Sequence, residues 1–323
     1  QELQDFADGK TKNLAIFLPT QVGKSEMATR RLPAYLLGRN PDQKIGCVSY
    51  SEDHARRFNR DIQRIIDLPE YARIFPDTRI NSRDNNVEGT WIRNSKKFEI
   101  VNHQGFLEVT GIGGPFNGIS LDVLIMDDTV KNRQDALSIA KQKFNREWWD
   151  AVGKLRLDNE GQILIVNTRW DEDDLAGHII ASKEFDIKVI VLPALKVDNS
   201  NPNDPRQIGD ALWPAKHSRK RYEAQRRANP VVFEAVQQQN PGTPKEILVY
   251  PQDWTVIQEL PDYSRFWGLD FGHSTSPDCL LEMCLNGIDL YVDEKFYETG
   301  MSTDELAEKI KSSGAAGGPI YCD

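Results

Sequence analysis

Short apolar runs alternate with longer, charge-rich segments through the first part of the chain. This alternation is typical of strands and covering helices in a parallel α/β sheet. Several of the runs are continuously apolar, which indicates strands that are buried on both faces. The expected strands are residues 14–18, 44–50, 106–110, 123–126, 162–167 and 187–192.

Amphipathic segments between these runs predict helices over residues 24–37, 51–66 and 134–152. The second of them has the clearest start. Ser51 is a good N-cap, and Glu52 and Asp53 place negative charge in the first turn, where the helix dipole favours it.

The pattern changes after Pro193. Residues 198–205 form a turn-rich loop, and a polar helix is expected over residues 219–239. A second pattern of three neighbouring strands, a helix and a further strand follows, which indicates a different topology and a domain boundary near residues 250–262. Its expected elements are strands 265–270, 279–285 and 289–297, helix 303–312 and strand 319–322.

The 323 residues are enough for two domains, and the 39% hydrophobic content can supply a core. A formal charge of −9 excludes a uniformly basic nucleic-acid coat protein, although local basic stripes can still bind phosphate. No run of 18 apolar residues and no leader is found, so we expect no membrane span or targeting segment. Because the first residue is Gln1 and the last run ends at Asp323, we expect a fragment.

The four cysteines, Cys47, Cys279, Cys284 and Cys322, are widely spaced and show no metal-binding spacing. They are expected to be buried thiols in a reducing cytoplasm.

The run 14–18 leads into Pro19-Thr-Gln-Val-Gly-Lys-Ser25 and then into a helix. Such a strand, loop and helix N-terminus can bind a triphosphate through backbone N–H groups and the helix dipole. Lys24 would contact the phosphates, and Ser25 would offer a hydroxyl to Mg²⁺. The loop departs from the usual motif, because Pro19 or its neighbour stands where the first glycine belongs.

Two further strands end in polar residues. Asp127 and Asp128 end the run 121–126, an arrangement in which one acid holds Mg²⁺ and the next orients the attacking water. Thr168 follows the run 162–167. Since parallel strands place their carboxyl ends at one sheet edge, the three groups together predict nucleotide hydrolysis.

These residues resemble the large terminase subunits of tailed bacteriophages, the ATP-driven DNA-packaging motors. The most specific stretch is Asn167-Thr-Arg-Trp-Asp-Glu-Asp-Asp-Leu-Ala-Gly177. Other matching stretches are Leu18-Pro-Thr-Gln-Val-Gly-Lys-Ser-Glu26, residues 48–57, residues 124–136 and Gly268-Leu-Asp-Phe-Gly272.

The resemblance implies a P-loop ATPase domain over residues 1–195, with a parallel sheet and helices on both faces. A linker subdomain over residues 196–261 and the N-terminal part of an RNase H-like nuclease domain over residues 262–323 would follow. ATP and Mg²⁺ are the implied cofactors. The implied nucleotide-binding residues are Gln21, Gly23, Lys24, Ser25 and Asp127.

By the same resemblance, Asp127 would hold the metal and Asp128 would stand where many members have the catalytic Glu. Thr168 would couple hydrolysis to movement. The arginine finger is left open between Arg133, Arg156 and Arg169, each of which also suits a surface or ion-pair role.

The implied nuclease needs carboxylates from separate strands around two Mg²⁺ or Mn²⁺ ions about 4 Å apart. Asp270 and Asp323 are the expected metal ligands, and a third acid would lie beyond residue 323. Asp270 also suits a turn.

The partners implied are double-stranded DNA, a portal protein and a small terminase subunit, with a homo-oligomeric ring acting in the host bacterial cytoplasm. Basic clusters around Arg56–Arg64, Lys131–Arg146 and Arg219–Arg227 could contact DNA phosphates or simply form solvated helix faces. Two alternatives stay open: a helicase-like nucleic-acid translocase, and a nucleotide-dependent scaffold with weak hydrolysis.

Overall fold

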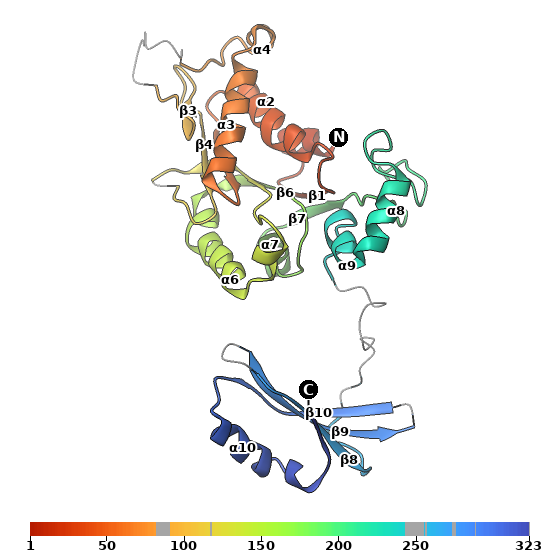
Figure 1. Cartoon of the computed structure of the whole chain (residues 1–323). Coiled ribbons are helices and arrows are strands. Elements are labelled where there is room, and N and C mark those ends of the chain that lie inside the picture. The colour runs from red at the N-terminus through yellow and green to blue at the C-terminus, as the bar shows by residue number, and fades with distance from the viewer. Residues whose placement is uncertain are drawn as a thin grey trace. The chain divides into compact units, whose positions relative to one another are not determined.

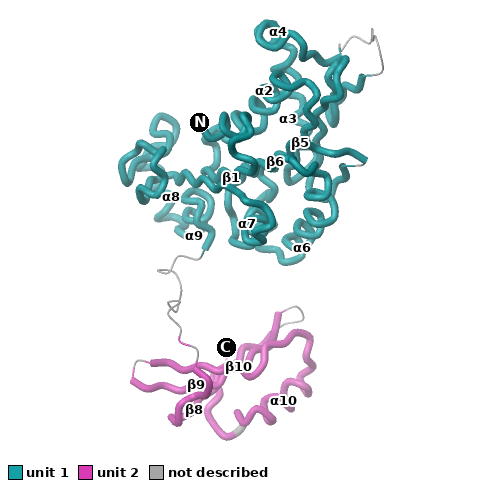
Figure 2. The backbone as a smooth tube through the Cα atoms, turned by 180° about the vertical axis from the view of Figure 1, so that it is seen from behind, with its two compact units in different colours: residues 1–249 teal, residues 250–323 magenta. Residues whose placement is uncertain are grey.

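The computed structural model describes residues 1–81, 91–116, 118–242, 255, 257–272, 276–287 and 289–322. The backbone forms two compact units, Gln1–Val249 and Tyr250–Asp323 (Figure 2). Each unit has its own sheet and its own apolar core. Residues 196–242 fall within the first unit.

A seven-stranded sheet in the order β3-β4-β2-β5-β6-β1-β7 forms the centre of the first unit. All of its described pairs are parallel except β3 with β4. The α/β fold with a mostly parallel sheet is therefore confirmed, and all six expected strands are present. The strands are β1 Asn13–Phe17, β2 Lys44–Ser49, β3 Lys97–Glu99, β4 Phe106–Gly111, β5 Leu121–Asp127, β6 Leu157–Asn167 and β7 Ile187–Val191.

Helices cover both faces of this sheet (Figure 1). Val123 and Ile125 of β5 pack in one apolar core with α2 and α3, whereas Leu124 and Met126 pack in the other with α6 and α7. Successive strand residues point to opposite faces, so a strand that is buried on both needs an unbroken apolar run. The helices of these two layers include α1 Glu2–Ala7, α2 Leu32–Arg39, α3 Glu52–Ile66, α6 Ile139–Trp148 and α7 Leu175–Ser182.

The helix expected over residues 51–66 is present as α3, and the Ser51 side chain accepts a hydrogen bond from the His54 backbone N–H. The single helix expected over residues 134–152 is wrong. The chain forms α5 (Arg133–Leu137), then α6, then a π-helical turn at Trp149–Gly153. Ser138 is extended and its hydroxyl caps α6, so a new helix starts there.

Two more expectations about helices need correction. Residues 26–31 of the first expected helix are π-helical (η1, Glu26–Arg31). The expected helix 219–239 divides into α8 (Arg219–Ala228), the short α9 (Pro230–Val232) and η4 (Phe233–Gln237). Asn229 takes a non-helical conformation and its side chain caps α9 immediately before Pro230. Sequence reasoning also missed α1, β3, α4 (Pro69–Ile74) and α7.

The second unit contains a four-stranded sheet in the order β10-β9-β8-β11. Strands β8, β9 and β10 pair antiparallel, and β11 pairs parallel with β8, so the first and fourth strands are neighbours. Helix α10 (Thr303–Ser312) packs on one face through Leu306, against Trp267 and Leu280. The strands are β8 Arg265–Asp270, β9 Pro277–Asn286, β10 Asp289–Thr299 and β11 Ile320–Cys322.

All four cysteines are free, but they are not all buried. Cys47 and Cys284 are buried, and burial raises the pKa of the Cys47 thiol. Cys322 is exposed because it lies on β11, whose three residues are poorly covered. Of the helices in the described ranges, none has the length and apolar content to cross a membrane.

A buried ion pair fixes the end of β6 against α7. The Nε atom of Arg169 lies 2.9 Å from a carboxylate oxygen of Asp174, whose side chain is only 1% exposed. Asp174 also caps α7 by accepting a hydrogen bond from the Gly177 N–H. Burial raises the pKa of Asp174, although the Arg169 guanidinium opposes that shift.

We expect Arg169→Met to lower the free energy of unfolding by about 3 kcal/mol, because it leaves a buried carboxylate without its cation. Urea denaturation followed by tryptophan fluorescence measures the change. Arg133→Met is the matched control: Arg133 is exposed, and its loss should change the free energy by less than about 0.5 kcal/mol. Equal stability of the two variants would contradict a stabilising role for the pair.

Candidate active site

Polar residues from three neighbouring strands meet at the carboxyl edge of the first unit's sheet. The strands β5, β6 and β1 lie side by side. The loop 18–25 follows β1, Asp127 ends β5, and Thr168 follows β6. The sequence predicts these groups at one edge of the sheet, and their side chains contact one another there.

The loop after β1 turns sharply into a helix. Gln21 and Gly23 both have positive φ, 60° and 86°. The left-handed conformation at position 23 suits glycine, which has no Cβ to clash with the backbone. By the spacing of the motif, Leu18 stands where the first glycine is usual. Without that glycine, the turn of the loop contains two residues in the left-handed conformation, Gln21 and Gly23.

Asp127 is a fully buried carboxylate at the end of the central strand. Its two oxygens accept hydrogen bonds from Ser25 Oγ at 3.1 Å and from Thr29 Oγ1 at 2.5 Å. Burial and the charge of Asp128 raise the pKa of Asp127 to about 7, while the Thr29 and Ser25 hydroxyls and Lys24 act in the opposite direction.

Thr29 was not foreseen as a site residue. It lies four positions after Ser25, which is about one helical turn, so the spacing of the two hydroxyls is the signal that could have identified it.

Lys24 contacts two of the other predicted site residues. Its Nζ atom lies 2.8 Å from an Asp128 carboxylate oxygen and donates a hydrogen bond to Thr168 Oγ1. The same Asp128 oxygen accepts a hydrogen bond from the Thr168 backbone N–H at 2.9 Å. Asp128 has a positive φ of 44°, a conformation that Asp tolerates better than most residues. These three residues form a closed set of contacts, which we call the Lys24 cluster.

The site therefore contains the Lys24 ammonium group, which belongs to a loop with two residues in the left-handed conformation. The Ser25 hydroxyl and the Asp127 carboxylate form a hydrogen-bonded pair in the same site. Carboxylate and hydroxyl oxygens are ligands that Mg²⁺ accepts. A cation at Ser25 and Asp127 would also offset the burial that raises the pKa of Asp127. Gln21 and Gly23 are exposed at the mouth of the loop. The residues present thus fit a magnesium-bound nucleotide.

The three arginine candidates have different surroundings. Arg169 is held by Asp174, and its guanidinium lies over the Phe17 ring at 4.9 Å from the ring centroid. Arg133 is exposed at the start of α5, and Arg156 is partly buried in a short 3-10 turn. Because its guanidinium pairs with the buried Asp174, Arg169 has a structural role in this structure.

Acidic neighbours neutralise part of each basic cluster. Arg56 pairs with Glu52, and Arg64 pairs with Asp61. In the other two clusters, Arg146 lies 3.3 Å from Asp173, and Arg219 lies 2.7 Å from Glu223. Contact between these clusters and DNA stays a prediction.

In the second unit, Asp270 is exposed at the end of β8. The neighbouring strand β11 pairs Cys322 with Leu269, the residue before Asp270. Asp323 lies outside the described residues. Within the part of the chain that the structure describes, no three His, Cys, Asp or Glu side chains gather closely enough to hold a metal ion.

Part of the chain matches a known protein family, and this family is the one that the sequence resembles. Residues 15–152 match the family described as "Terminase large subunit, T4likevirus-type, N-terminal". No curated protein matches the chain.

Three solved structures show similarity to the chain. A large terminase from a thermophilic bacteriophage (crystal form 3) is 11% identical over 100% of this chain and 81% of that chain, with a TM-score of 0.44. The Thermus phage P74-26 large terminase ATPase domain is 15% identical over 70% of this chain and 87% of that chain, with a TM-score of 0.42. The bacteriophage Phi-29 viral genome packaging motor assembly is 12% identical over 99% of this chain and 86% of that chain, with a TM-score of 0.38.

The family match begins within β1 and ends in the turn after α6, so it includes the loop 18–25, Asp127 and Asp128. Residues 15–152 are therefore similar to the N-terminal region of a terminase large subunit, the family that the sequence motifs resemble.

Proposed function

We propose that this chain is the ATPase of a DNA-packaging motor. The observation that carries the proposal is the convergence of Lys24, the Ser25–Asp127 pair and Asp128 at one sheet edge. These groups have the chemistry that phosphoryl transfer needs: a cation for the phosphates, ligands for Mg²⁺ and a carboxylate near the attacking water. The family match over residues 15–152 supports packaging as the process that this hydrolysis drives.

Each residue would have a separate role in hydrolysis. Lys24 leaves Asp128 and Thr168 to bind the β- and γ-phosphates, while the loop from Gln21 to Ser25 directs backbone N–H groups at them. Ser25 and Asp127 hold Mg²⁺, which neutralises charge on the phosphate oxygens when bound. Asp128, freed from Lys24, orients the attacking water. Thr168 loses its contact with Lys24 in this exchange, and this loss affects the end of β6.

The wider context is part of the same proposal. Copies of the chain would act as a ring with a portal protein and a small terminase subunit, and move double-stranded DNA in the host cytoplasm. A grip through phosphates alone suits a motor that moves DNA of every sequence, because such contacts carry no base specificity.

Lys24→Ala should lower the rate of ATP hydrolysis at least about 100-fold, because it removes the positive charge that stabilises the transferred phosphoryl group. A phosphate-release assay measures the rate, and circular dichroism checks the fold. Lys12→Ala is the matched control, since Lys12 is exposed and pairs with Glu160 away from the loop. A Lys24→Ala variant with wild-type turnover would overturn the phosphate site. Wild-type binding of ATP without DNA-stimulated turnover would favour the scaffold function.

Exchange of each acid for its amide should separate their roles. Asp127→Asn should weaken binding of magnesium nucleotide, because the amide supplies no negative charge to the cation. Asp128→Asn should not weaken binding, because Asp128 only competes with nucleotide for Lys24, and it should lose turnover, because only this acid handles the water. Fluorescent-nucleotide titration gives affinity, and single-turnover assays give the rate. Equal losses of affinity would show that the roles are not divided in this way.

A metal-dependent nuclease is the second proposed function, and the residues that support it lie in the second unit. The exposed carboxylate of Asp270 ends β8 beside the parallel strand β11. Asp323 directly follows β11 in the sequence, and we propose that the two acids share the divalent ions.

In a chain that extends beyond residue 323 and includes the third acid, Asp270→Asn should abolish Mn²⁺-dependent plasmid cleavage and leave ATP hydrolysis near wild type, because the acid belongs to the other compact unit. Gel electrophoresis of supercoiled plasmid measures cleavage. Asp289→Asn, an exposed acid at the start of β10, is the control. Cleavage by Asp270→Asn at the wild-type rate would show that Asp270 is not a ligand.

A further inference from the structure

Three consecutive glutamines at the end of η4 each contact a different part of the first unit. Gln237 Nε2 donates a hydrogen bond to Thr20 Oγ1 in the phosphate loop, at 3.4 Å. Gln239 Oε1 accepts a hydrogen bond from the backbone N–H of Arg169, at 3.0 Å. Arg169 is the residue after Thr168. The end of η4 therefore contacts both the loop that would bind phosphate and the segment that follows β6.

The middle glutamine anchors this segment. Gln238 is buried, and its amide accepts from the Leu195 N–H at 2.9 Å and donates to the Leu195 carbonyl at 3.1 Å. The Ala194 N–H also donates to the Gln237 carbonyl at 2.8 Å. These backbone contacts hold η4 in a fixed position beside the phosphate loop.

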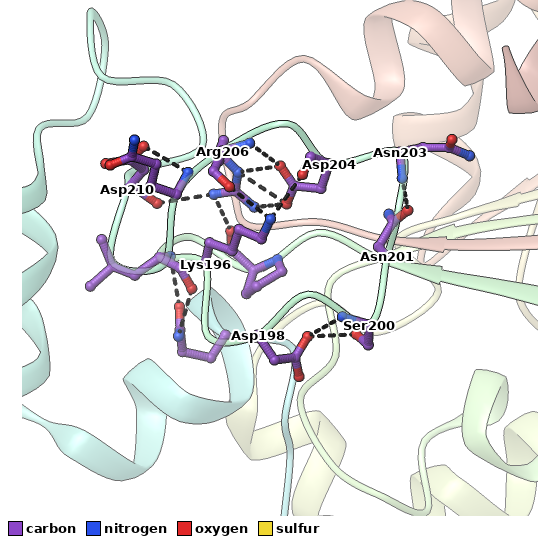
Figure 3. Close-up of polar contacts among 12 residues, drawn as sticks. Lys196, Asp198, Ser200, Asn201, Asn203, Asp204, Arg206 and Asp210 are labelled. Carbon is purple, nitrogen blue, oxygen red and sulfur yellow. Dashed lines mark hydrogen bonds and ion pairs between the residues drawn. The ribbon is translucent and has the colours of Figure 1, made fainter.

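Hydrogen bonds and an ion pair cross-link the loop after Leu195 (Figure 3). Lys196 Nζ donates to the backbone carbonyls of Asp204 and Arg206 at 2.8 and 2.7 Å. The Arg206 guanidinium pairs with the Asp204 carboxylate and donates to the Pro193 carbonyl at 3.0 Å. Gln238 thus rests on a well-ordered support, and movement at the phosphate loop would act on Gln237.

Gln237 is incompletely paired in this structure. Its contact with Thr20 is long for a hydrogen bond, and its buried Oε1 atom has no hydrogen-bond partner among the described residues. A buried polar atom without a partner is costly, and a shift that supplies one is favoured.

Nucleotide would disturb both ends of this segment. Phosphates bound at the loop would alter the position of Thr20 and compete with Asp128 and Thr168 for Lys24. Release of Thr168 acts on Arg169, whose N–H is bonded to Gln239. A ligand shifts a conformational equilibrium only through contacts that differ between the two states. The Lys24 cluster and the Gln237 contact are two such contacts.

We propose that Gln237 is a positioning residue that pairs fully with the phosphate loop when nucleotide binds. Through Gln237 and Gln239, the state of the nucleotide site is transmitted to α8, α9 and η4, the segment that leads along the chain toward the second unit. This inference rests on the proposed ATPase function and deepens it.

Gln237→Met keeps the length of the side chain and removes its amide. The KM for ATP should rise about 5-fold, the effect of one neutral hydrogen bond. Gln225→Met is the matched control: Gln225 lies in α8 and also has a buried, unpaired Oε1, but it makes no described hydrogen bond to the loop. The control should stay within about 2-fold of the wild type.

Hydrogen exchange measures transmission directly. A non-hydrolysable ATP analogue should slow amide exchange over residues 219–239 in the wild type and in Gln225→Met. In Gln237→Met at saturating analogue, exchange over residues 219–239 should slow less than in the wild type, because only the Gln239 contact remains. Equal slowing over residues 219–239 in Gln237→Met, or a KM equal to that of Gln225→Met, would overturn the role of Gln237.

Thr20→Val tests the contact from its other side, and its effect on KM should not add to that of Gln237→Met. Additive effects would contradict the contact. A wild type that neither binds nor hydrolyses ATP would contradict the proposed function and this inference together. A wild type that hydrolyses ATP while the two methionine variants behave alike would contradict this inference alone.

Discussion

The buried carboxylate of Asp127 is the constraint on which the site depends. A charge at the end of a central strand is costly unless hydroxyl groups or cations surround it. Ser25 and Thr29 provide hydroxyl groups from the turn and helix that follow β1, so the position of the phosphate loop is tied to the end of β5. Burial and the charge of Asp128 raise the pKa of Asp127, and the Thr29 and Ser25 hydroxyls oppose that shift.

The Lys24 cluster adds a second tie between the same strands. Lys24 from the loop, Asp128 after β5 and Thr168 after β6 hold one another across three neighbouring strand ends. The glutamines at the end of η4 extend the set to the segment before the second unit. A change at the loop therefore affects contacts with three other parts of the chain, the ends of β5, β6 and η4.

The strands and the first contacts of the site could be predicted because the signals are local. Continuous apolar runs such as residues 123–126 leave few alternatives to a buried strand, and parallel strands bring Lys24, Asp127 and Thr168 to one edge. Helix interruptions were missed, since Ser138 and Asn229 can either continue a helix or cap a new one, and tertiary packing decides between the two. Gln237 could not be found from sequence, because its partner Thr20 lies 217 positions away.

The internal partners of Lys24 have a consequence for turnover. When phosphate leaves the loop, the ammonium group is not left alone in a poorly solvated position, because Asp128 and Thr168 take it back. Under the proposed function, Asp128 and Thr168 would compete with the product for Lys24, which would lower product affinity and shorten the time for which the product stays bound. If the chain hydrolyses ATP as proposed, a loop without such partners would hold product more tightly and release it more slowly.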